Sequence, residues 1–353
     1  MILGEVDTLD FLGNKSGMLE QLDTAIKSRL SPNSQVLDLF SGTGAVAQYL
    51  ADSGHTVHAN DMLPLAVTWA RTRLMVTDKP TFAGVAELAA FKQADRYAAA
   101  LTYLNALPPV RGWVTESFTP ASIESTPFER RYFTEANGMR IDAIRNQLLR
   151  WKNALPLPEW SLLMSSLLEG VSAVSNIAGT YGSYLKEYKP RALESIKLTA
   201  LPLPNRTPKA HSVTEGDAAI AVASSDATLV YADPPYTKRQ YAAYYHVLNS
   251  IAGTDNPRLI GKTGLPDWRQ WSSDWCYSTK APLALDRLVR ATKAPILVLS
   301  YSSDGHIPHD AILQILGARG QVSYSETERR RFRSSSKVHK SATVLERIYV
   351  MEK

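Results

Sequence analysis

The sequence predicts an α/β protein, with a mostly parallel sheet closed by an antiparallel strand and a helical region inserted into it. Three observations lead to this prediction. Apolar runs typical of buried strands occur at 36–40, 56–59, 229–232 and 296–300. A glycine-containing turn and a helix join the first two, as in a parallel βαβ unit. Residues 82–204 show no such alternation and consist mainly of helix-like segments punctuated by proline.

Length and composition are those of an ordinary globular protein. The 353 residues are 44% apolar and 21% charged, and the net charge of +5 is mild. No apolar run approaches the roughly 20 residues that span a bilayer, and the acidic start, Met1 to Asp10, lacks the pattern of a secretory signal. The single Cys276 excludes intrachain disulfides and thiolate zinc sites, which fits a reducing cytoplasm. His55 and His58 have no metal-type partner nearby, so no metal site is predicted.

The first predicted strand leads into a glycine-containing turn. Residues 36–40 form a buried-strand pattern with one acid, Asp38, inside it. The turn Ser41-Gly42-Thr43-Gly44 follows, and a helix is predicted for 45–51. Glycine lets the backbone turn tightly and approach a ligand closely. We therefore expect a ligand at this turn, beside the start of the helix.

An acid stands at the end of the second strand. Asp61 lies about 20 residues beyond Gly42, the position at which an acid holds a ribose diol in nucleotide-binding units. Two ligands fit this pattern, a dinucleotide and S-adenosylmethionine. Because Gly42, Gly44 and Ala47 also satisfy the relaxed form G-x-G-x-x-A, the dinucleotide is a real competitor.

The tetrapeptide Asp233-Pro234-Pro235-Tyr236 directly follows the strand 229–232. Proline fixes its own φ and pushes the preceding residue into extended geometry, so this strand end is stiff. It presents a carboxylate, a backbone carbonyl and an aromatic ring together. The carboxylate of Asp233 and the carbonyl of Pro234 can accept both N–H bonds of an amino group on a planar heterocycle, and Tyr236 can stack on its ring.

The remaining chain divides into a predicted catalytic domain, 1–80 and 205–353, and a predicted mainly helical insert, 81–204, for target recognition. Segments 322–327 and 344–350 are predicted to form a closing antiparallel pair. Helical spacing of apolar residues predicts further helices over 18–30, 62–75, 85–107, 136–152, 162–177, 242–251, 284–291 and 310–316.

Three segments, 329–340, 128–133 and 178–186, could contact nucleic acid. Six cations and no acid lie in 329–340, which favours a phosphate contact over a merely solvated face. Bases mix with aromatics in 128–133, although a helix start with half-buried aromatics explains this equally well. Residues 178–186 fit a nucleic-acid contact or a tight interhelical turn. The irregular stretch 256–275 is long enough to be functional or mobile.

In its motifs the chain resembles the D12-class adenine-N6 DNA methyltransferases, of the alpha arrangement that includes the DNA adenine methylases. The resemblance rests on Phe11-Leu12-Gly13-Asn14-Lys15, Phe40-Ser41-Gly42-Thr43-Gly44 and Asp233-Pro234-Pro235-Tyr236, in that order. It covers about residues 11–350. It implies a Rossmann-like sheet that binds S-adenosyl-L-methionine, and a helical insert that recognises DNA. Gly13-Asn14 departs from the two glycines common before the lysine in this family.

The predicted site residues combine the patterns above with the roles that the resemblance implies. Asp217, in a Gly-Asp pair, would approach the cofactor's adenine, with Asp226 as the poorer candidate. The catalytic residues would be Asp233, Pro234, Pro235 and Tyr236. The cofactor would be bound by Phe11, Lys15, Asp38, Phe40, Ser41, Gly42, Thr43, Gly44, Asp61, Asp217 and Asp233. DNA would be contacted by Lys238, Arg239, Tyr241, Arg130, Arg131, Arg330, Arg331 and Arg333.

The expected reaction is methyl transfer from S-adenosylmethionine to N6 of an adenine flipped out of a specific double-stranded DNA sequence. Hydrogen bonds from N6 to Asp233 and Pro234 would orient its lone pair toward the methyl group. No covalent intermediate is needed, so Cys276 is expected to be a buried small apolar residue. We expect a cytoplasmic monomer of prokaryotic or phage origin, with a cognate restriction endonuclease or other defence-system partner.

Alternatives remain open at this point. A cytosine-N4 DNA methyltransferase would use nearly the same chemistry, and an RNA adenine methyltransferase would prefer single strands. A dinucleotide-dependent oxidoreductase would explain the glycine turn and Asp61 and leave the tetrapeptide unexplained. A catalytically dead DNA-binding regulator would not need the intact tetrapeptide.

Overall fold

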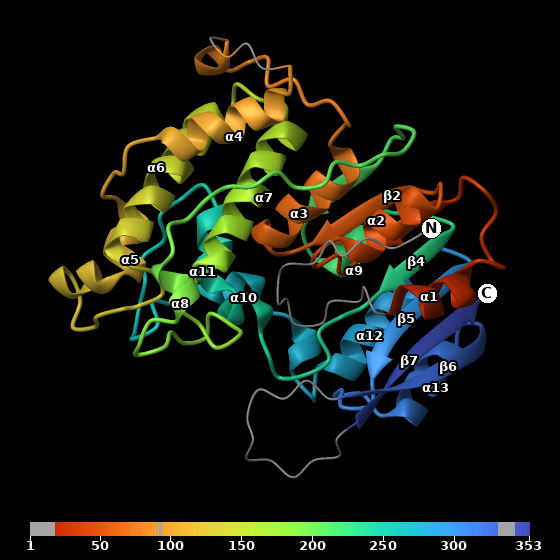
Figure 1. The fold of residues 1–353 in the computed structure, drawn as a ribbon. Helices are drawn as coiled ribbons and strands as arrows, with labels where there is room; N and C mark the ends of the chain where they lie inside the picture. Colours follow the sequence, from red (N-terminus) through yellow and green to blue (C-terminus); the bar gives the residue numbers. More distant parts are fainter. Residues whose placement is uncertain (1–17, 90, 92–93, 331–342) are drawn as a thin grey trace. The chain divides into compact units, whose positions relative to one another are not determined.

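The computed structural model describes residues 18–89, 91, 94–330 and 343–353 (Figure 1). These residues form two compact units. We call one the sheet unit (residues 18–70, 209–241, 271–330 and 343–353) and the other the helical unit (residues 71–89, 91, 94–208 and 242–270). Within the described part of the chain, no helix is both long and apolar enough to cross a bilayer.

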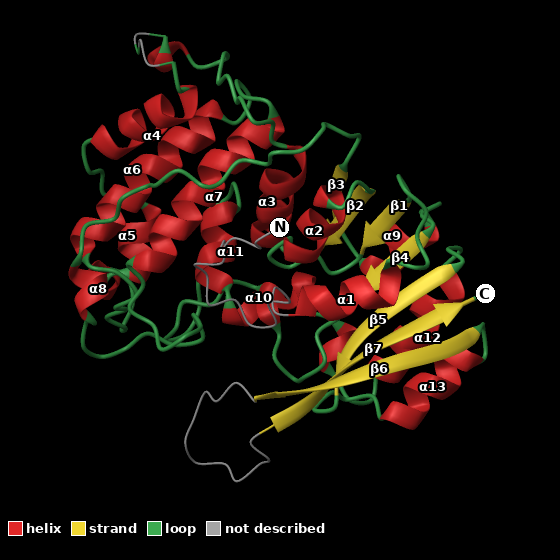
Figure 2. Cartoon of the chain, turned by 45° about the vertical axis from the view of Figure 1, so that its right-hand side comes forward, coloured by secondary structure: helices red, strands yellow, loops and turns green. Residues whose placement is uncertain are grey.

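The sheet unit contains a seven-stranded sheet in the order β3-β2-β1-β4-β5-β7-β6 (Figure 2). Strands β1 to β5 pair in parallel, whereas β7 runs antiparallel to both β5 and β6. The predicted fold class is therefore confirmed, including the closing antiparallel pair. The strands are β1 Gln35–Asp38, β2 Thr56–Asp61, β3 Ser212–Glu215, β4 Leu229–Ala232, β5 Ile296–Ser302, β6 Gln321–Arg330 and β7 Thr343–Glu352.

The helical unit is built around α6 and α7, which pack against each other. Thr134 caps α6 by accepting the N–H of Asn137, and Asp95 caps α4 in the same way through Ala98.

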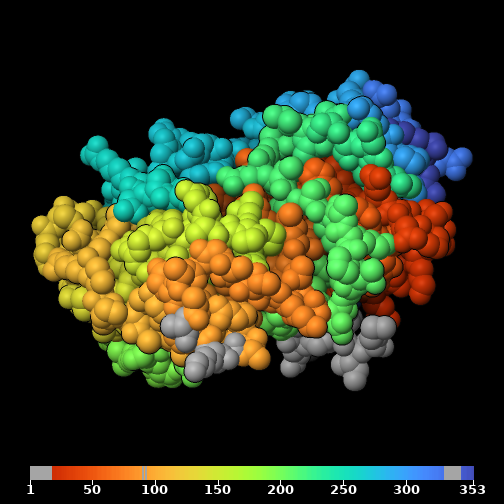
Figure 3. Space-filling view, turned by 90° about the horizontal axis from the view of Figure 1, so that it is seen from above, coloured from red at the N-terminus to blue at the C-terminus, as the bar shows by residue number. Residues whose placement is uncertain are grey.

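In Figure 3, teal atoms from residues near 250–265 lie on the surface beside yellow atoms from residues near 120–130. The helices are η2 Ala86–Leu88, α4 Arg96–Ala106, α5 Trp113–Phe118, η3 Pro120–Glu124, α6 Glu135–Trp151, α7 Leu157–Ala173, α8 Pro190–Leu193 and α11 His246–Ala252.

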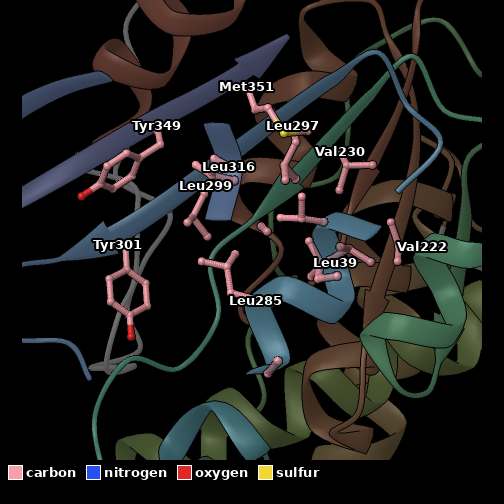
Figure 4. Packing of buried hydrophobic residues seen from close by; sticks show 14 of the residues in the cluster. Leu39, Val222, Val230, Leu285, Leu297, Leu299, Tyr301, Leu316, Tyr349 and Met351 are labelled. Carbon is pink, nitrogen blue, oxygen red and sulfur yellow. The ribbon is translucent and has the colours of Figure 1, made fainter. Parts of the chain in front are cut away.

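One face of the sheet carries the main apolar core. Buried side chains of α9, α12 and α13 pack there against alternate strand residues (Figure 4). Leu37 and Leu39 belong to this core, so Asp38 between them points to the opposite face. The helices of this unit are α1 Leu19–Ile26, α2 Ala45–Asp52, α9 Ala218–Ala223, η5 Asp274–Cys276, α12 Ala281–Ala291 and α13 His309–Gly317. The chain passes between the units within α3 Pro64–Met75, α10 Tyr241–Tyr244 and η4 Trp268–Trp271.

Two helices that were predicted to be continuous are interrupted in the structure. The helix predicted over 85–107 is interrupted, because only 86–88 and 96–106 are helical. The one predicted over 242–251 is split at Tyr245, which has a φ of −117° and a ψ of 20°. Residues 242–270 also pack with the helical unit, although the sequence placed them in the catalytic domain. The functional division into catalytic domain and recognition insert stays a prediction.

Candidate active site

Three acids converge at the carboxyl ends of neighbouring parallel strands in the sheet unit. In the sheet register Asp38 of β1 pairs with Ala59 of β2 and with Tyr231 of β4. Asp61 and Asp233 each lie two residues beyond these partners, and side chains two apart on a strand share a face. Asp38, Asp61 and Asp233 therefore belong to the same face and the same edge of the sheet. Ligands bind at this edge in open α/β sheets.

Asp38 is the most constrained of the three acids. Its side chain is buried, with only 1% exposed, and among the described residues neither carboxylate oxygen has a hydrogen-bond partner. Burial is the largest of the causes that raise the pKa of Asp38 to about 8. The nearby Asp233 and Asp61 act in the same direction, and the backbone N–H groups of Phe40 and Ala47 oppose the shift. An unsatisfied buried carboxyl group is costly. A cation placed beside it would remove that cost.

Asp61 holds the glycine turn in place. One carboxylate oxygen accepts the N–H of Gly42 at 2.9 Å and the other accepts that of Leu63 at 3.0 Å. Gly42 and Gly44 have φ values of 51° and 78°, a region that strongly favours glycine. Burial raises the pKa of Asp61, and the hydrogen bonds from Gly42, Leu63 and Met62 oppose that shift. The turn that the sequence predicted is thus present and fixed by the predicted acid.

Two neighbouring side chains complete the support of this turn. Buried Asn60 donates to the carbonyls of Leu39 and Gly216 at 3.2 and 3.1 Å, so it joins the loops after β1 and β3. Phe40 packs edge-on against Trp275, with ring centroids 5.7 Å apart. The supporting roles of Asn60 and Trp275 could not be read from the sequence, since both depend on non-local contacts.

The loop after β3 adds a polar and an apolar group to this edge. Exposed Asp217 caps α9 through one oxygen, which accepts the N–H groups of Ala219 and Ile220 at 2.8 and 3.3 Å. The side chain of Ile220 is 73% exposed, unusual for a large apolar residue at a helix start. An exposed apolar side chain beside a capping acid could receive a planar ring. In the sequence, the signal for this group is the apolar residue three positions after the Gly-Asp pair.

The tetrapeptide leaves β4 in irregular backbone, as its two prolines predict. Asp233 is half-buried and Pro234 is buried. The Tyr236 carbonyl accepts the N–H of His306 at 3.0 Å, and its ring lies edge-on to Tyr301 with centroids 5.9 Å apart. Burial is the main cause that raises the pKa of the Tyr236 phenol. Stacking of Tyr236 on a base remains a prediction.

The predicted DNA-binding residues have different environments. Lys238 is exposed, and Arg239 and Tyr241 are half-buried. Arg131 pairs with Glu129 at 2.7 Å and donates to the carbonyl of Lys186 at 2.6 Å. Arg130 is only 2% exposed and donates to three backbone carbonyls. We therefore leave Arg130 out of the DNA-binding set, because its charge is satisfied inside the helical unit.

Other predicted residues cannot be placed. Phe11, Lys15, Arg331 and Arg333 lie outside the described residues, as does the side chain of Arg330. Among the residues that are described, no group of three or more His, Cys, Asp or Glu is arranged to hold a metal ion.

A profile of the family "D12 class N6 adenine-specific DNA methyltransferase" matches residues 11–304. The chain belongs to this class. The Type II methyltransferase M.NlaIII of Neisseria lactamica is 30% identical over 98% of this chain and 99% of that protein. Modification methylase StsI of Streptococcus sanguinis is 29% identical over 97% of this chain, which spans only 52% of that protein.

Among solved structures, a SAM-dependent methyltransferase from Agrobacterium tumefaciens matches 96% of this chain and 61% of that chain. Its identity of 13% and TM-score of 0.32 are too low to carry an argument. Family membership confirms the predicted class and its methyl donor, S-adenosyl-L-methionine, with DNA as the substrate class. It favours none of the alternatives that the sequence left open.

Proposed function

We propose that this D12-class chain transfers a methyl group from S-adenosyl-L-methionine to N6 of a flipped adenine in a specific double-stranded DNA sequence. The observation that supports this most is the meeting of Asp38, Asp61 and the Asp-Pro-Pro-Tyr tetrapeptide at one edge of the sheet. It combines a cation-binding cluster with acceptors for an amino group. The family match supplies the nature of donor and acceptor.

The residues at the sheet edge fit the donor. When bound, S-adenosylmethionine supplies a methyl group on a positively charged sulfur and carries an ammonium group as well. Buried Asp38 offers two oxygens without hydrogen-bond partners among the described residues, and a cation beside it would draw its pKa back down. Asp61 fixes the glycine turn through the N–H of Gly42 and would hold the ribose, while Asp217 and exposed Ile220 offer an acceptor and an apolar surface for the adenine.

The tetrapeptide would orient the acceptor amine. An exocyclic amine conjugated with its ring is a weak nucleophile. The carboxylate of Asp233 and the carbonyl of Pro234 would accept its two N–H groups and favour a more tetrahedral nitrogen, with its lone pair directed at the methyl group. The C–S bond of the donor breaks as the N–C bond forms, and N6 loses one proton to solvent. Pro235 would keep the backbone stiff, and Tyr236 would stack on the base.

The test is Asp233→Ala, with N6-methyladenine measured by nucleoside analysis of DNA incubated with the protein and donor. Activity should fall by about 10³-fold, as when one oriented transition-state hydrogen bond is lost, while donor binding by calorimetry persists. Asp310→Ala is the matched control, because this exposed acid belongs to the same unit and is not among the predicted site residues. Substantial turnover by Asp233→Ala would rule out the assigned role.

The wider setting is also part of the proposal. The relatives named as a Type II methyltransferase and a modification methylase support a role beside a restriction endonuclease of the same specificity. We place the protein in the cytoplasm of a prokaryotic or phage-infected cell, and as a monomer. Genomic DNA from cells expressing the chain should resist one restriction enzyme, and light scattering should give a mass near 39.0 kDa.

A further inference from the structure

The helical unit contains a short hairpin outside the predicted recognition insert. Residues 256–265, which we call the 256–265 hairpin, close through a pair of backbone hydrogen bonds between Ile260 and Leu265, at 2.8 and 3.0 Å. Gly261 and Gly264 both have a φ of 68°, which shapes the turn. The hairpin carries two cations and no acid.

Buried side chains from two other segments hold this hairpin. Arg130 donates to the carbonyls of Gly261 and Lys262 at 3.0 and 3.2 Å. The Tyr132 hydroxyl contacts the Thr263 carbonyl at 3.1 Å. Gly264 leaves room for this arrangement, because a Cβ there would lie 3.1 Å from the Arg130 guanidinium.

A second arginine fixes the start of the hairpin. Arg145 of α6 is 1% exposed and donates to the carbonyls of Gly253 and Asp255 at 3.0 and 2.8 Å and to the side chain of Asn256 at 2.8 Å. Burying two guanidinium groups is expensive unless their donors are satisfied. Here backbone carbonyls of the hairpin and its base satisfy them. The hairpin is therefore held in one defined conformation.

The side chains that this scaffold presents face solvent. Ile260, in the pair that closes the turn, is 61% exposed, and Arg258 and Lys262, two residues before and after it, are exposed. Neither cation has a hydrogen bond or ion pair with any residue that the structure describes. The hairpin lies on the surface of the helical unit in Figure 3. Exposing a large apolar side chain on a rigid hairpin gives no stability to the folded chain.

Duplex DNA matches this combination of groups. The two cations of the hairpin can contact phosphates, which are the main source of affinity and position a protein on the duplex. An apolar side chain between them can contact thymine methyl groups or base steps. We propose that the 256–265 hairpin is a DNA-contacting element, in which Arg258 and Lys262 contact phosphates and Ile260 lies against the bases in a groove. This inference rests on the proposed function only for the identity of the nucleic acid.

Two variants test it in the full chain. One is Ile260→Ser, matched by Ile123→Ser, since Ile123 is 58% exposed elsewhere in the helical unit. The other is the double variant Arg258→Ala/Lys262→Ala, matched by Lys79→Ala/Lys197→Ala, which removes two other exposed cations of that unit. Binding to a fluorescent duplex is measured by anisotropy across a salt series, and thermal unfolding shows that each variant folds.

The two variants should weaken DNA binding in different ways. The double variant should reduce the slope of log Kd against log salt by roughly 1.8, because each phosphate contact contributes about 0.9. Ile260→Ser should keep the slope and weaken binding roughly tenfold. The proposal is overturned if both variants bind and methylate DNA as their matched controls do.

The binding measurement needs no catalysis, so the two proposals can fail separately. Wild-type protein that binds duplex through the hairpin but leaves adenine unmethylated would contradict the proposed function and retain the hairpin's role. If the wild-type protein methylates DNA and both hairpin variants bind and methylate it equally well, the hairpin's role alone is contradicted. Asp233→Ala should bind the duplex with the wild-type salt slope.

Discussion

Asp38 of the sheet unit and Asp142 of the helical unit are both aspartates with 1% of the side chain exposed, yet their surroundings are opposite. Asp142 accepts the N–H groups of Val114 and Thr115, both at 2.8 Å, and the Thr115 hydroxyl at 2.6 Å. It thereby caps the start of α5. Asp38 has no such partners among the described residues. Burial raises the pKa of both groups, and for Asp142 hydrogen bonds from the side chain and backbone of Thr115 and the backbone of Val114 oppose the shift.

Buried charged residues of the helical unit have a structural role, whereas buried Asp38 of the sheet unit belongs to the candidate site. In the helical unit Arg130, Arg145 and Asp142 are buried and satisfied, so each stabilises the fold by fixing a loop or a helix end. In the sheet unit an acid is buried beside two other acids without such compensation. A fold retains that kind of strain where a ligand relieves it, as at functional sites generally.

The largest effect should come from removing the satisfied acid. Asp142→Ala leaves two backbone N–H groups and a hydroxyl buried without their acceptor, so the free energy of unfolding should fall by about 3–5 kcal/mol. Urea unfolding followed by circular dichroism measures this loss. Asp142→Asn keeps one acceptor oxygen and should lose less. If the free energy of unfolding of Asp142→Ala falls by less than about 1 kcal/mol, Asp142 does not have the stabilising role that distinguishes it from Asp38.

Asp38→Asn should instead stabilise the ligand-free protein. The unfolded carboxyl ionises near its ordinary pKa of 3.8, whereas the folded one keeps its proton up to about 8. Wild-type stability is therefore lost as pH rises through this window, by on the order of 5 kcal/mol at most. Asparagine cannot ionise, so the advantage of the variant in melting temperature should grow from pH 4 to 8 and then stay constant. A pH-independent difference between the two proteins would contradict this account.

The same variant should weaken the binding of S-adenosylmethionine. At pH 7 a cation beside Asp38 favours its ionised form, so wild-type protein should release a proton when the donor binds. Calorimetry in two buffers of different ionisation enthalpy measures that release. Asp38→Asn should show weaker binding and no such release, and tight binding by the variant would place the cation elsewhere.

A smaller effect is expected at Gly264. Its φ of 68° disfavours any side chain, and an added Cβ would crowd the Arg130 guanidinium at 3.1 Å. Gly264→Ala should lower the free energy of unfolding by about 1–2 kcal/mol. Gly317→Ala is the matched control, since its Cβ would meet nothing within 4 Å and its φ is not in the left-handed region. Chemical denaturation measures the free energy of unfolding of both variants. An equal loss in the two would contradict close packing of Arg130 against the hairpin at Gly264.

The smallest effect should be at Cys276. Burial raises the pKa of this thiol to about 12, so it stays protonated, and it donates weakly to the Arg239 carbonyl at 3.3 Å. Cys276→Ser preserves a donor of similar size, so methylation should stay within about twofold of wild type. A large loss of turnover in a variant that melts normally would implicate the thiol in the reaction.

The sequence by itself determined the sheet edge of this protein. The strands, the glycine turn, Asp61 and the tetrapeptide follow from local patterns, because strand ends, glycine turns and prolines are specified by neighbouring residues. The order of these motifs also identified the family. Local patterns placed Asp38 inside its strand as well, although its missing partners emerged only when the neighbouring strands were in place.

Tertiary structure decided what the remaining polar residues do. Arg130 and Arg131 are adjacent in sequence, yet one is buried and anchors the 256–265 hairpin while the other is half-exposed. Their partners, Lys262 and Lys186, lie far away in the chain. Burial and hydrogen-bond satisfaction depend on such long-range neighbours, which residue patterns do not encode. For that reason the assignment of the hairpin to the helical unit, and of Asp142 to the scaffold, required the fold.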